Sequence, residues 1–508
     1  MSFSMNFKRI YYLVLLITLL SIFLFRIPTQ KNALAKFDAA SLNTHNTIAR
    51  VKSSVSTSNS IFLPLIVRND PWQNPFGIES NRLLMPGSLL LQRAIDLKTG
   101  WARLNSRISW RQLQPTEDSP ILWDKLTDFE SELGAIKATN LTPVVIINDY
   151  PRWATINNVR KDLQPTSCGP IRADKFDAFA RFVSEVVARY KTSAFNVHNW
   201  EFGNEPDVDP NLVPPDNVFG CWGNIDDEFY GGRYYGEMLK AVGPRVKAED
   251  PTAHIWIGGL LLSVPDSSGT GNGRPELFLK GILEANAASH FDVIPYHWYP
   301  TYWQGINDYD THSDLAWDSW GGGVIGKAIF LRQIMGQYNV DKPLILNETG
   351  FGCQDSRAWC VNPDDQFYQL QADLLVRMFT RGISVNLMGA VWYTLDGPGW
   401  WYTGLLDGNT NPKPSYNAYQ QLTIKLYQTL YIGPVNYGNP IEAYAFRQLD
   451  RQIHVLWTKV NQSTTITVPA EKFIAAYSRD GIVINGTLVG SDYVIPVGFS
   501  PIYIVRNP

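Results

Sequence analysis

Two short stretches decide the expected fold of this chain: Trp200-Glu201-Phe202-Gly203-Asn204-Glu205-Pro206 and Leu344-Ile345-Leu346-Asn347-Glu348-Thr349-Gly350. In each, a short run ends in a glutamate that a turn-forming residue follows closely. This pattern is typical of a buried parallel strand that carries a side chain to the carboxyl end of a sheet. We therefore expect Glu205 and Glu348 to face each other across one site, an arrangement that suits cleavage of a glycosidic bond.

An Asn-Glu-Pro tripeptide alone also fits a capped turn with a solvated glutamate. Three features favour the strand-end interpretation. The run before Asn204 is apolar and aromatic, and a second strand-end glutamate follows at residue 348. Between them lies a third run, Val293-Ile294-Pro295-Tyr296-His297-Trp298-Tyr299, which ends in polar aromatic residues.

Beyond Pro71, short apolar runs alternate with amphipathic stretches. The runs predict strands at 76–78, 105–109, 143–147, 197–203, 255–260, 293–298, 344–348 and 387–393. The clearest helical pattern places one set of apolar residues on a single face: Phe176, Phe179, Val183, Val186 and Tyr190. Eight strands alternating with helices predict an α/β fold of the (β/α)8 TIM-barrel type. The rival, a doubly wound open sheet, usually has a glycine-rich phosphate loop after its first strand, and Gly77-Ile78-Glu79 is no such loop.

The length of 508 residues predicts a large domain with a smaller one beside it. After about residue 433 the pattern becomes β-rich, as in Ile453-His454-Val455-Leu456-Trp457, and turns such as Asn485-Gly486 separate the later strands. We therefore assign residues 71–432 to the barrel and 433–508 to a small antiparallel β-domain. We expect this β-domain to be a structural cap, and a separate carbohydrate-binding role is the alternative.

The start of the chain indicates export. Lys8-Arg9 precede an apolar run at 10–25, and Ala33-Leu34-Ala35 offers a small-x-small cleavage site. Residues 1–35 are therefore either a cleaved signal peptide or an uncleaved anchor, which would associate with a membrane through residues 10–25. Residues 36–70, rich in Ser, Thr, Asn and Ala, predict a flexible linker. The expected location is secreted or at the cell surface.

The net charge and the aromatic content of the chain narrow the classes of molecule that it is expected to bind. A formal net charge of −3 argues against a nucleic-acid partner, whose phosphates call for a basic face. Aromatic residues make up 13% of the chain and include 17 Trp, a side chain that suits stacking on sugar faces as well as core packing. A carbohydrate is therefore the expected substrate.

The two glutamate motifs resemble those of the clan A glycoside hydrolases, a retaining (β/α)8-barrel group that includes family 5 cellulases and family 39 xylosidases. The resemblance covers about residues 74–430 and is specific only at these motifs. It implies that Glu205 is the acid/base and Glu348 the nucleophile, acting on a β-linked oligo- or polysaccharide without a cofactor. Burial beside a second carboxylate would raise the pKa of an acid catalyst in the needed direction.

The same resemblance implies roles for four further polar residues. Asn204 would bond the sugar 2-hydroxyl. His297 and Tyr299 form a His-x-Tyr pattern in which Tyr299 would donate a hydrogen bond to Glu348 and His297 would touch substrate, or else be a structural histidine. Arg107, on the second strand, resembles the arginine that supports the nucleophile in family 5.

Two positions near the strand ends complete this set. Asn148 ends the third strand where family 5 usually has histidine, a departure from the pattern of that family. Trp392 ends the eighth strand, where the clan places its sugar-stacking platform. Predicted loops on the same face carry more aromatic residues, some of which we expect to line an oligosaccharide site: Trp153, Trp222, Tyr302, Trp303, Trp359, Trp400 and Trp401.

The four cysteines favour disulfides in an exported protein. Cys353 and Cys360 flank a short loop, and Cys168 and Cys221 lie in loops after neighbouring strands, so we pair them in that way. A cysteine metal site would call for Cys-x2-Cys spacing, which is missing. Asp308, Asp310 and Asp314 fit a calcium loop or, as we favour, a solvated acidic loop.

Two alternatives to a hydrolase stay open. A non-catalytic barrel could bind glycans, although a binding protein has no need for a matched acid and nucleophile. A transglycosylase would share the covalent intermediate of a retaining hydrolase. Release of reducing sugar separates the first alternative from a hydrolase, and product analysis with and without an acceptor separates the second.

Overall fold

The structure, a computed structural model, describes residues 74–157, 159–164, 166–266, 273–303, 308–312, 315–354 and 356–508, all within one compact unit, Pro71–Pro508. The expected signal peptide or anchor (1–35), the linker (36–70) and Asp314 lie outside these residues. Within them, no helix is both long and apolar enough to cross a membrane.

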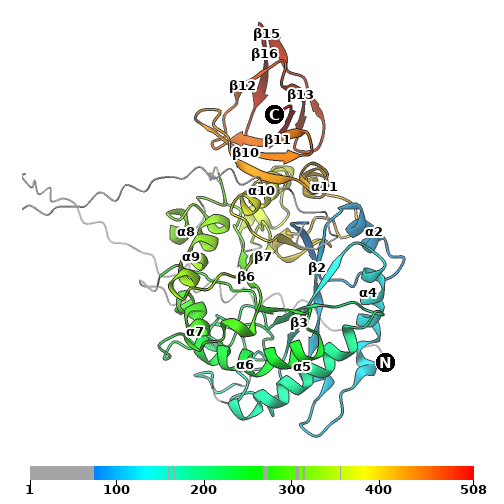
Figure 1. Ribbon diagram of the computed structural model, residues 1–508, viewed down its shortest axis with the longest axis vertical. Helices are drawn as coiled ribbons and strands as arrows, with labels where there is room; N and C mark the ends of the chain where they lie inside the picture. Colours follow the sequence, from blue (N-terminus) through cyan, green and yellow to red (C-terminus); the bar gives the residue numbers. More distant parts are fainter. Residues whose placement is uncertain are drawn as a thin grey trace, which may run out of the picture. The chain divides into compact units, whose positions relative to one another are not determined.

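Parallel strands form a closed barrel, as the sequence predicted (Figure 1). Their order in the sheet is β5-β4-β3-β2-β1-β8-β7-β6, and two parallel bridges, Trp256–Val293 and Leu260–Tyr296, close it between the β5 and β6 segments. The strands are β1 (Phe76–Ser80), β2 (Trp101–Ser109), β3 (Thr142–Asn148), β4 (Asn199–Phe202), β5 (His254–Ile257), β6 (Ile294–Trp298), β7 (Leu344–Thr349) and β8 (Ala390–Tyr393).

Helices surround this barrel and connect its strands (Figure 1). The main ones are α2 (Leu89–Asp96), α4 (Thr127–Lys137), α5 (Phe176–Tyr190), α6 (Gly232–Glu249), α7 (Phe278–Glu284), α9 (Gly323–Gln337), α10 (Asp365–Ser384) and α11 (Pro414–Leu426), with the short α3 (Trp110–Leu113) and α8 (Leu315–Asp318). The apolar face predicted from Phe176 to Tyr190 is buried along the whole of α5, which confirms that helix.

The barrel interior changes from apolar to charged along the strands. A layer of large side chains fills one level: Trp101, Val144, Trp256, Val293, Ile345 and Val391. Successive side chains in a strand point to opposite faces, so the residue two positions on shares the same face. Two positions after Trp101 lies Arg103, and two after Ile345 lies Asn347, both fully buried. The strands therefore deliver polar groups toward their carboxyl ends, where barrel enzymes carry their sites.

An antiparallel β-domain follows the barrel, as predicted. One sheet has the order β14-β13-β17-β11-β10-β9 and the other β12-β16-β15. The strands are β9 (Leu430–Pro434), β10 (Ile441–Gln448), β11 (Arg451–Thr458), β12 (Thr464–Pro469), β13 (Phe473–Ser478), β14 (Val483–Ile484), β15 (Thr487–Val489), β16 (Asp492–Val497) and β17 (Ile502–Arg506). Apolar residues from both sheets form a separate core between them. Since β9 begins at Leu430, it straddles the boundary expected at residue 433.

A buried ion cluster joins this β-domain to the barrel. Arg381 of α10 donates hydrogen bonds to Asp308 and Asp310, which follow β6, and to Glu442 of β10, with its shortest contact to each at 2.7–2.9 Å. Arg377 adds a contact to Asp308 at 3.2 Å. Asp308 and Asp310 are therefore buried ion-pair partners, which corrects our expectation of a solvated acidic loop. Their oxygens face arginines, so the calcium alternative is wrong for these two residues as well.

We predict that Arg381→Met destabilises the protein by about 3–5 kcal/mol, because removing one partner leaves buried carboxylates without their counter-ion. Urea unfolding followed by circular dichroism measures this as a lower midpoint of the first transition. Arg451→Met is the control, because that arginine is more than half exposed and its nearest carboxylate, on Asp450, is 4.0 Å away. Equal midpoints for the two variants would contradict a stabilising role of the cluster.

Candidate active site

The two predicted glutamates lie at the carboxyl ends of their strands. Glu348 is the fifth residue of β7, and Glu205 follows β4 by three residues. The backbone at Glu205 has φ +50°, an uncommon conformation for a residue with a side chain, and its N–H donates to the carbonyl of Gly259 at 2.9 Å. Such backbone strain is concentrated at functional sites. The backbone conformation and this hydrogen bond thus fix the direction of the Glu205 side chain.

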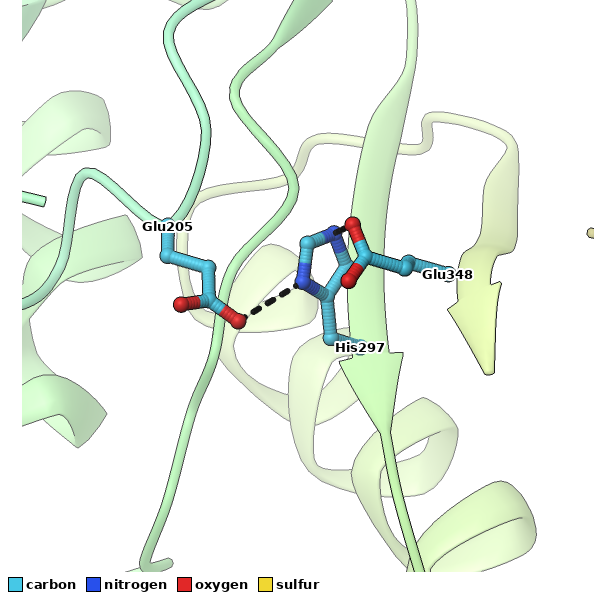
Figure 2. Close-up of side chains that lie close together, drawn as sticks. All are labelled: Glu205, His297 and Glu348. Carbon is cyan, nitrogen blue, oxygen red and sulfur yellow. Dashed lines mark hydrogen bonds and ion pairs between the residues drawn. The ribbon is translucent and has the colours of Figure 1, made fainter. Parts of the chain in front are cut away.

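His297 lies between the two carboxylates (Figure 2). Its Nδ1 is 3.0 Å from Glu205 Oε1, and its Nε2 is 3.7 Å from Glu348 Oε2. One oxygen of each glutamate and one ring nitrogen all lie within 4.8 Å of one another. The expectation that the two glutamates share one site is therefore met in the structure. Burial by itself would lower the pKa of His297, but the nearby negative charges of Glu348 and Glu205 raise it above its ordinary value.

Glu348 is surrounded by donors that favour its ionised form. Arg103 Nη1 donates to Oε2 at 2.6 Å and the Tyr299 hydroxyl donates to Oε1 at 2.7 Å. The hydrogen bond predicted for Tyr299 is thus present. Burial alone would raise the pKa of Glu348, yet the charges of His297 and Arg103 and these hydrogen bonds lower it below the ordinary value. Glu348 is therefore held as a carboxylate.

Arg103 organises the whole site. The guanidinium is fully buried, and each of its five N–H groups has an acceptor. It binds Glu201 through two parallel hydrogen bonds of 2.8 and 3.0 Å. The remaining N–H groups reach Glu79, Glu348 and Asn204 Oδ1, each at 2.6 Å. One cation thus ties β1, β2, β4 and β7 together.

Glu201 is fixed in turn by donors from two other strand ends. Its Oε1 accepts hydrogen bonds from Asn347 Nδ2 and from the N–H of Gly259, both at 3.0 Å. A β-carbon at position 259 would lie 2.2 Å from His297 Nε2, so only glycine allows this approach. Glu201 therefore has the partners that a fully buried carboxylate requires.

Sequence reasoning missed Arg103, Glu79 and Glu201. Each is a charged residue inside an otherwise apolar strand, and that signal was available in Trp101-Ala102-Arg103 and in Trp200-Glu201-Phe202. It assigned the role of supporting the nucleophile to Arg107 instead, which is wrong. The pairing of β2 with β3 is irregular between Leu104 and Ile108, and Arg107 donates to Asn105 at 2.8 Å rather than to Glu348.

The expectation that Trp392 forms a sugar-stacking platform is also wrong. Its ring is fully buried, so no face is open for a sugar, and its Nε1–H donates to the carbonyl of Thr403 at 2.9 Å. The next residue, Tyr393, is half-buried and meets Tyr299 edge-on at 6.3 Å. Trp400, also half-buried, packs edge-on against Tyr299 at 5.1 Å. Tyr393 and Trp400 thus pack against Tyr299, the tyrosine that donates to Glu348.

The remaining residues with predicted substrate contacts lie in or near the site. Asn148 is buried and donates to the carbonyl of Val218, and half-buried Trp153 packs edge-on against Trp110. Asn204 lies beside Glu205 with its Oδ1 held by Arg103. Substrate contacts of Asn148, Trp153, Asn204, Arg107 and His297 stay predictions. The two predicted disulfides, Cys168–Cys221 and Cys353–Cys360, are both formed.

Glu205, His297 and Glu348 are also spaced closely enough to ligate a cation. However, each carboxylate oxygen of Glu348 already accepts a hydrogen bond, and Arg103 Nη1 lies 2.6 Å from Oε2. A metal ion would compete with that guanidinium. The donor set therefore fits acid–base and nucleophilic chemistry better than metal binding.

Known proteins are similar to this chain in fold. No protein-family model and no curated sequence matches it. A family 39 glycoside hydrolase from Bacteroides cellulosilyticus WH2 superposes with a TM-score of 0.62 at 18% identity, over 86% of this chain and 82% of that one. A family 30 endoxylanase from Clostridium papyrosolvens C71 gives 0.55 at 14% identity, over 86% and 96%. A monomeric β-xylosidase from Caulobacter crescentus CB15 gives 0.53 at 15% identity, over the same shares. The chain therefore has the barrel fold of these clan A glycoside hydrolases.

We predict that Glu79 makes the protein less stable as the pH rises through neutrality. Burial, partly offset by Arg103 and reinforced by the charge of Glu348, raises the pKa of Glu79 from 4.5 to about 7. The folded state thus binds this proton more tightly than the unfolded state does, so the stabilisation is complete below pH 4.5 and is lost as the pH rises to about 7. His297, whose pKa is also raised, contributes in the same direction.

Thermal unfolding between about pH 5 and about pH 8 measures this effect. Glu79→Gln should show a smaller fall in the melting temperature over this interval than the wild type, because one titrating group is removed while an acceptor for Arg103 is kept. Asp450→Asn, which removes an exposed carboxylate, should behave as the wild type. A Glu79→Gln profile that parallels the wild type would contradict the assignment.

Proposed function

We propose that the protein is an exported retaining glycoside hydrolase that cleaves β-linked oligo- or polysaccharides by double displacement. The observation that carries the proposal is the pair Glu205 and Glu348. One carboxylate oxygen of Glu205 lies within 4.8 Å of one of Glu348, and the two carboxyl groups have different surroundings. Carboxyl groups about 5–5.5 Å apart are typical of retaining enzymes, whereas inverting enzymes leave about 6.5–9.5 Å for a water molecule. The close spacing supports retention.

In the first step, a Glu348 oxygen attacks the anomeric carbon while the protonated carboxyl of Glu205 gives its proton to the leaving oxygen. Arg103 and Tyr299 keep Glu348 ionised before the attack. In the second step, Glu205 takes a proton from water, the water oxygen bonds to the anomeric carbon, and Glu348 is released as a carboxylate. His297 Nδ1, at 3.0 Å from Glu205 Oε1, holds that carboxyl in position for both proton transfers.

Two neighbouring groups would help to hold the sugar. Because Arg103 binds the Oδ1 end of Asn204, the Nδ2 end is the donor left for a sugar hydroxyl. Tyr393 and Trp400 place ring faces and edges beside Tyr299, where a sugar ring could stack. Two structurally similar proteins are an endoxylanase and a β-xylosidase, which supports a β-linked substrate for this chain as well.

Export is supported by the two disulfides, which form and persist in oxidising compartments. The charged and apolar segment at residues 1–35 gives the route, as a cleaved signal peptide or as an anchor. A glycan-binding barrel without activity has no use for Arg103 as a support for one ionised carboxylate. Product analysis with and without an acceptor sugar distinguishes hydrolysis from transglycosylation.

We predict that the two glutamates fail in different ways when each is replaced. Glu205→Ala should cripple hydrolysis of natural glycosides but still form the intermediate quickly from a dinitrophenyl glycoside, whose leaving group needs no proton. Azide should then speed turnover and yield the β-azide from a β-glycoside, because azide attacks without a general base. Glu348→Ala removes the nucleophile, so a good leaving group should not restore double displacement.

The assay uses a panel of aryl β-glycosides together with glucan, mannan and xylan. Glu237→Ala is the matched control, because Glu237 is an exposed glutamate on α6, and its rates should equal those of the wild type. If Glu348→Ala keeps aryl-glycoside activity and Glu205→Ala loses it, the roles are reversed. If neither change matters, the site lies elsewhere.

A further inference from the structure

Two tryptophans on the catalytic face expose a large part of their side chains to solvent. Trp303 follows β6 and is 47% exposed, and Trp359 follows β7 and is 39% exposed. Their rings meet at right angles with centroids 5.9 Å apart. Every other tryptophan in the described residues is buried or half-buried. A paired, exposed aromatic surface of this kind marks an interaction site.

The loops that carry this tryptophan pair are braced. The disulfide Cys353–Cys360 closes the short loop that holds Trp359. The β6 loop pairs with it through the parallel bridge Thr301–Gly352, and the guanidinium of Arg357 lies over the ring of Trp303 at 4.3 Å. Arg357 also donates to the carbonyl of Tyr302 at 2.6 Å. The two rings are thus held in place before any ligand arrives, which lowers the entropic cost of binding.

Aromatic contacts and one backbone hydrogen bond connect Glu348, the proposed nucleophile, to the loop that carries Trp359. Tyr299, which hydrogen-bonds Glu348, packs against Trp400, and Trp400 stacks on Trp401 with centroids 3.8 Å apart. The carbonyl of Trp401 accepts a hydrogen bond from the N–H of Cys353, which begins the disulfide-closed loop that carries Trp359. Four Cα–Cα steps separate Tyr299 from Trp303, so their Cα atoms are at most about 15 Å apart. Any separation up to this limit lies within reach of a short oligosaccharide.

We propose that Trp303 and Trp359 form a remote sugar-binding subsite, so that the substrate is a polysaccharide chain rather than a short glycoside. A sugar ring of the chain stacks its C–H face on one of the two exposed indoles and contacts the edge of the other, while the cleaved bond lies at Glu205 and Glu348. The Arg357 charge next to Trp303 provides donors for ring hydroxyls. The inference rests on the proposed glycosidase function, and it assigns that function a substrate of several sugar units.

The test compares polysaccharide binding with short-substrate turnover in the full chain. Affinity electrophoresis in gels containing xylan, mixed-linkage glucan or galactomannan measures binding without relying on catalysis. We expect the wild type to be retarded by at least one of these, and Trp303→Ala combined with Trp359→Ala to weaken that binding at least about tenfold. The kcat/KM for the matching aryl glycoside should stay within about twofold. Trp359→Tyr, which keeps an aromatic ring, should retain most of the binding.

The control is Tyr427→Ala, because Tyr427 is a similarly exposed aromatic residue that caps the far end of α11. Binding by the double variant equal to the wild type, or parallel loss of binding and aryl-glycoside turnover, would overturn the subsite. So would a wild type that none of the three polysaccharides retards. Binding through the tryptophan pair without hydrolysis of any substrate would support the subsite and contradict the hydrolase. Hydrolysis that is independent of the pair would do the reverse.

Discussion

The site depends on one constraint: a fully buried arginine must satisfy three carboxylates at once. Arg103 is the shared counter-ion of Glu79, Glu201 and Glu348, with no contact longer than 3.0 Å. Carboxylates so close together in a medium of low dielectric constant repel strongly without it. The three carboxylates therefore differ: Glu201 accepts two hydrogen bonds from Arg103, the pKa of Glu79 is raised to about 7, and the pKa of Glu348 is lowered.

This constraint explains why the two catalytic candidates differ although both are glutamates beside one histidine. Glu348 receives an arginine and a tyrosine hydroxyl, so it stays charged. Glu205 has His297 as its partner and a strained backbone that aims it across the barrel opening. Two carboxylates in unequal surroundings are the usual basis for dividing acid and nucleophile roles. The apolar layer around Trp101 and Trp256 lies beneath them in the barrel interior.

Much of this could be predicted from sequence because apolar runs and turn residues are local signals. The strands, the β-domain and the two glutamates follow from them, the Tyr299 hydrogen bond follows from the resemblance that they support, and both disulfides follow from the predicted positions of the loops that carry the cysteines. The inward direction of a side chain is not local, since it depends on strand register. An irregularity in β2 lies between Arg103, which reaches the site, and Arg107, which does not. Similarly, Trp392 is buried, whereas the next residue, Tyr393, lies at the site. Ion-pair partners such as Glu79 and Glu201 come from strands far apart in the chain.

The central claim is that Glu348, which Arg103 holds as a carboxylate, is the residue that attacks the sugar, and covalent trapping tests it most directly. A 2-deoxy-2-fluoro β-glycoside with a dinitrophenolate leaving group forms the intermediate faster than water removes it, so the modified residue can be found by peptide mass mapping. With a panel of such glycosides, the account predicts one added fluoroglycosyl group, on the peptide that contains Glu348. Labelling of Glu205 or Glu79 instead, or turnover of the substrate with no label on Glu348, would contradict it.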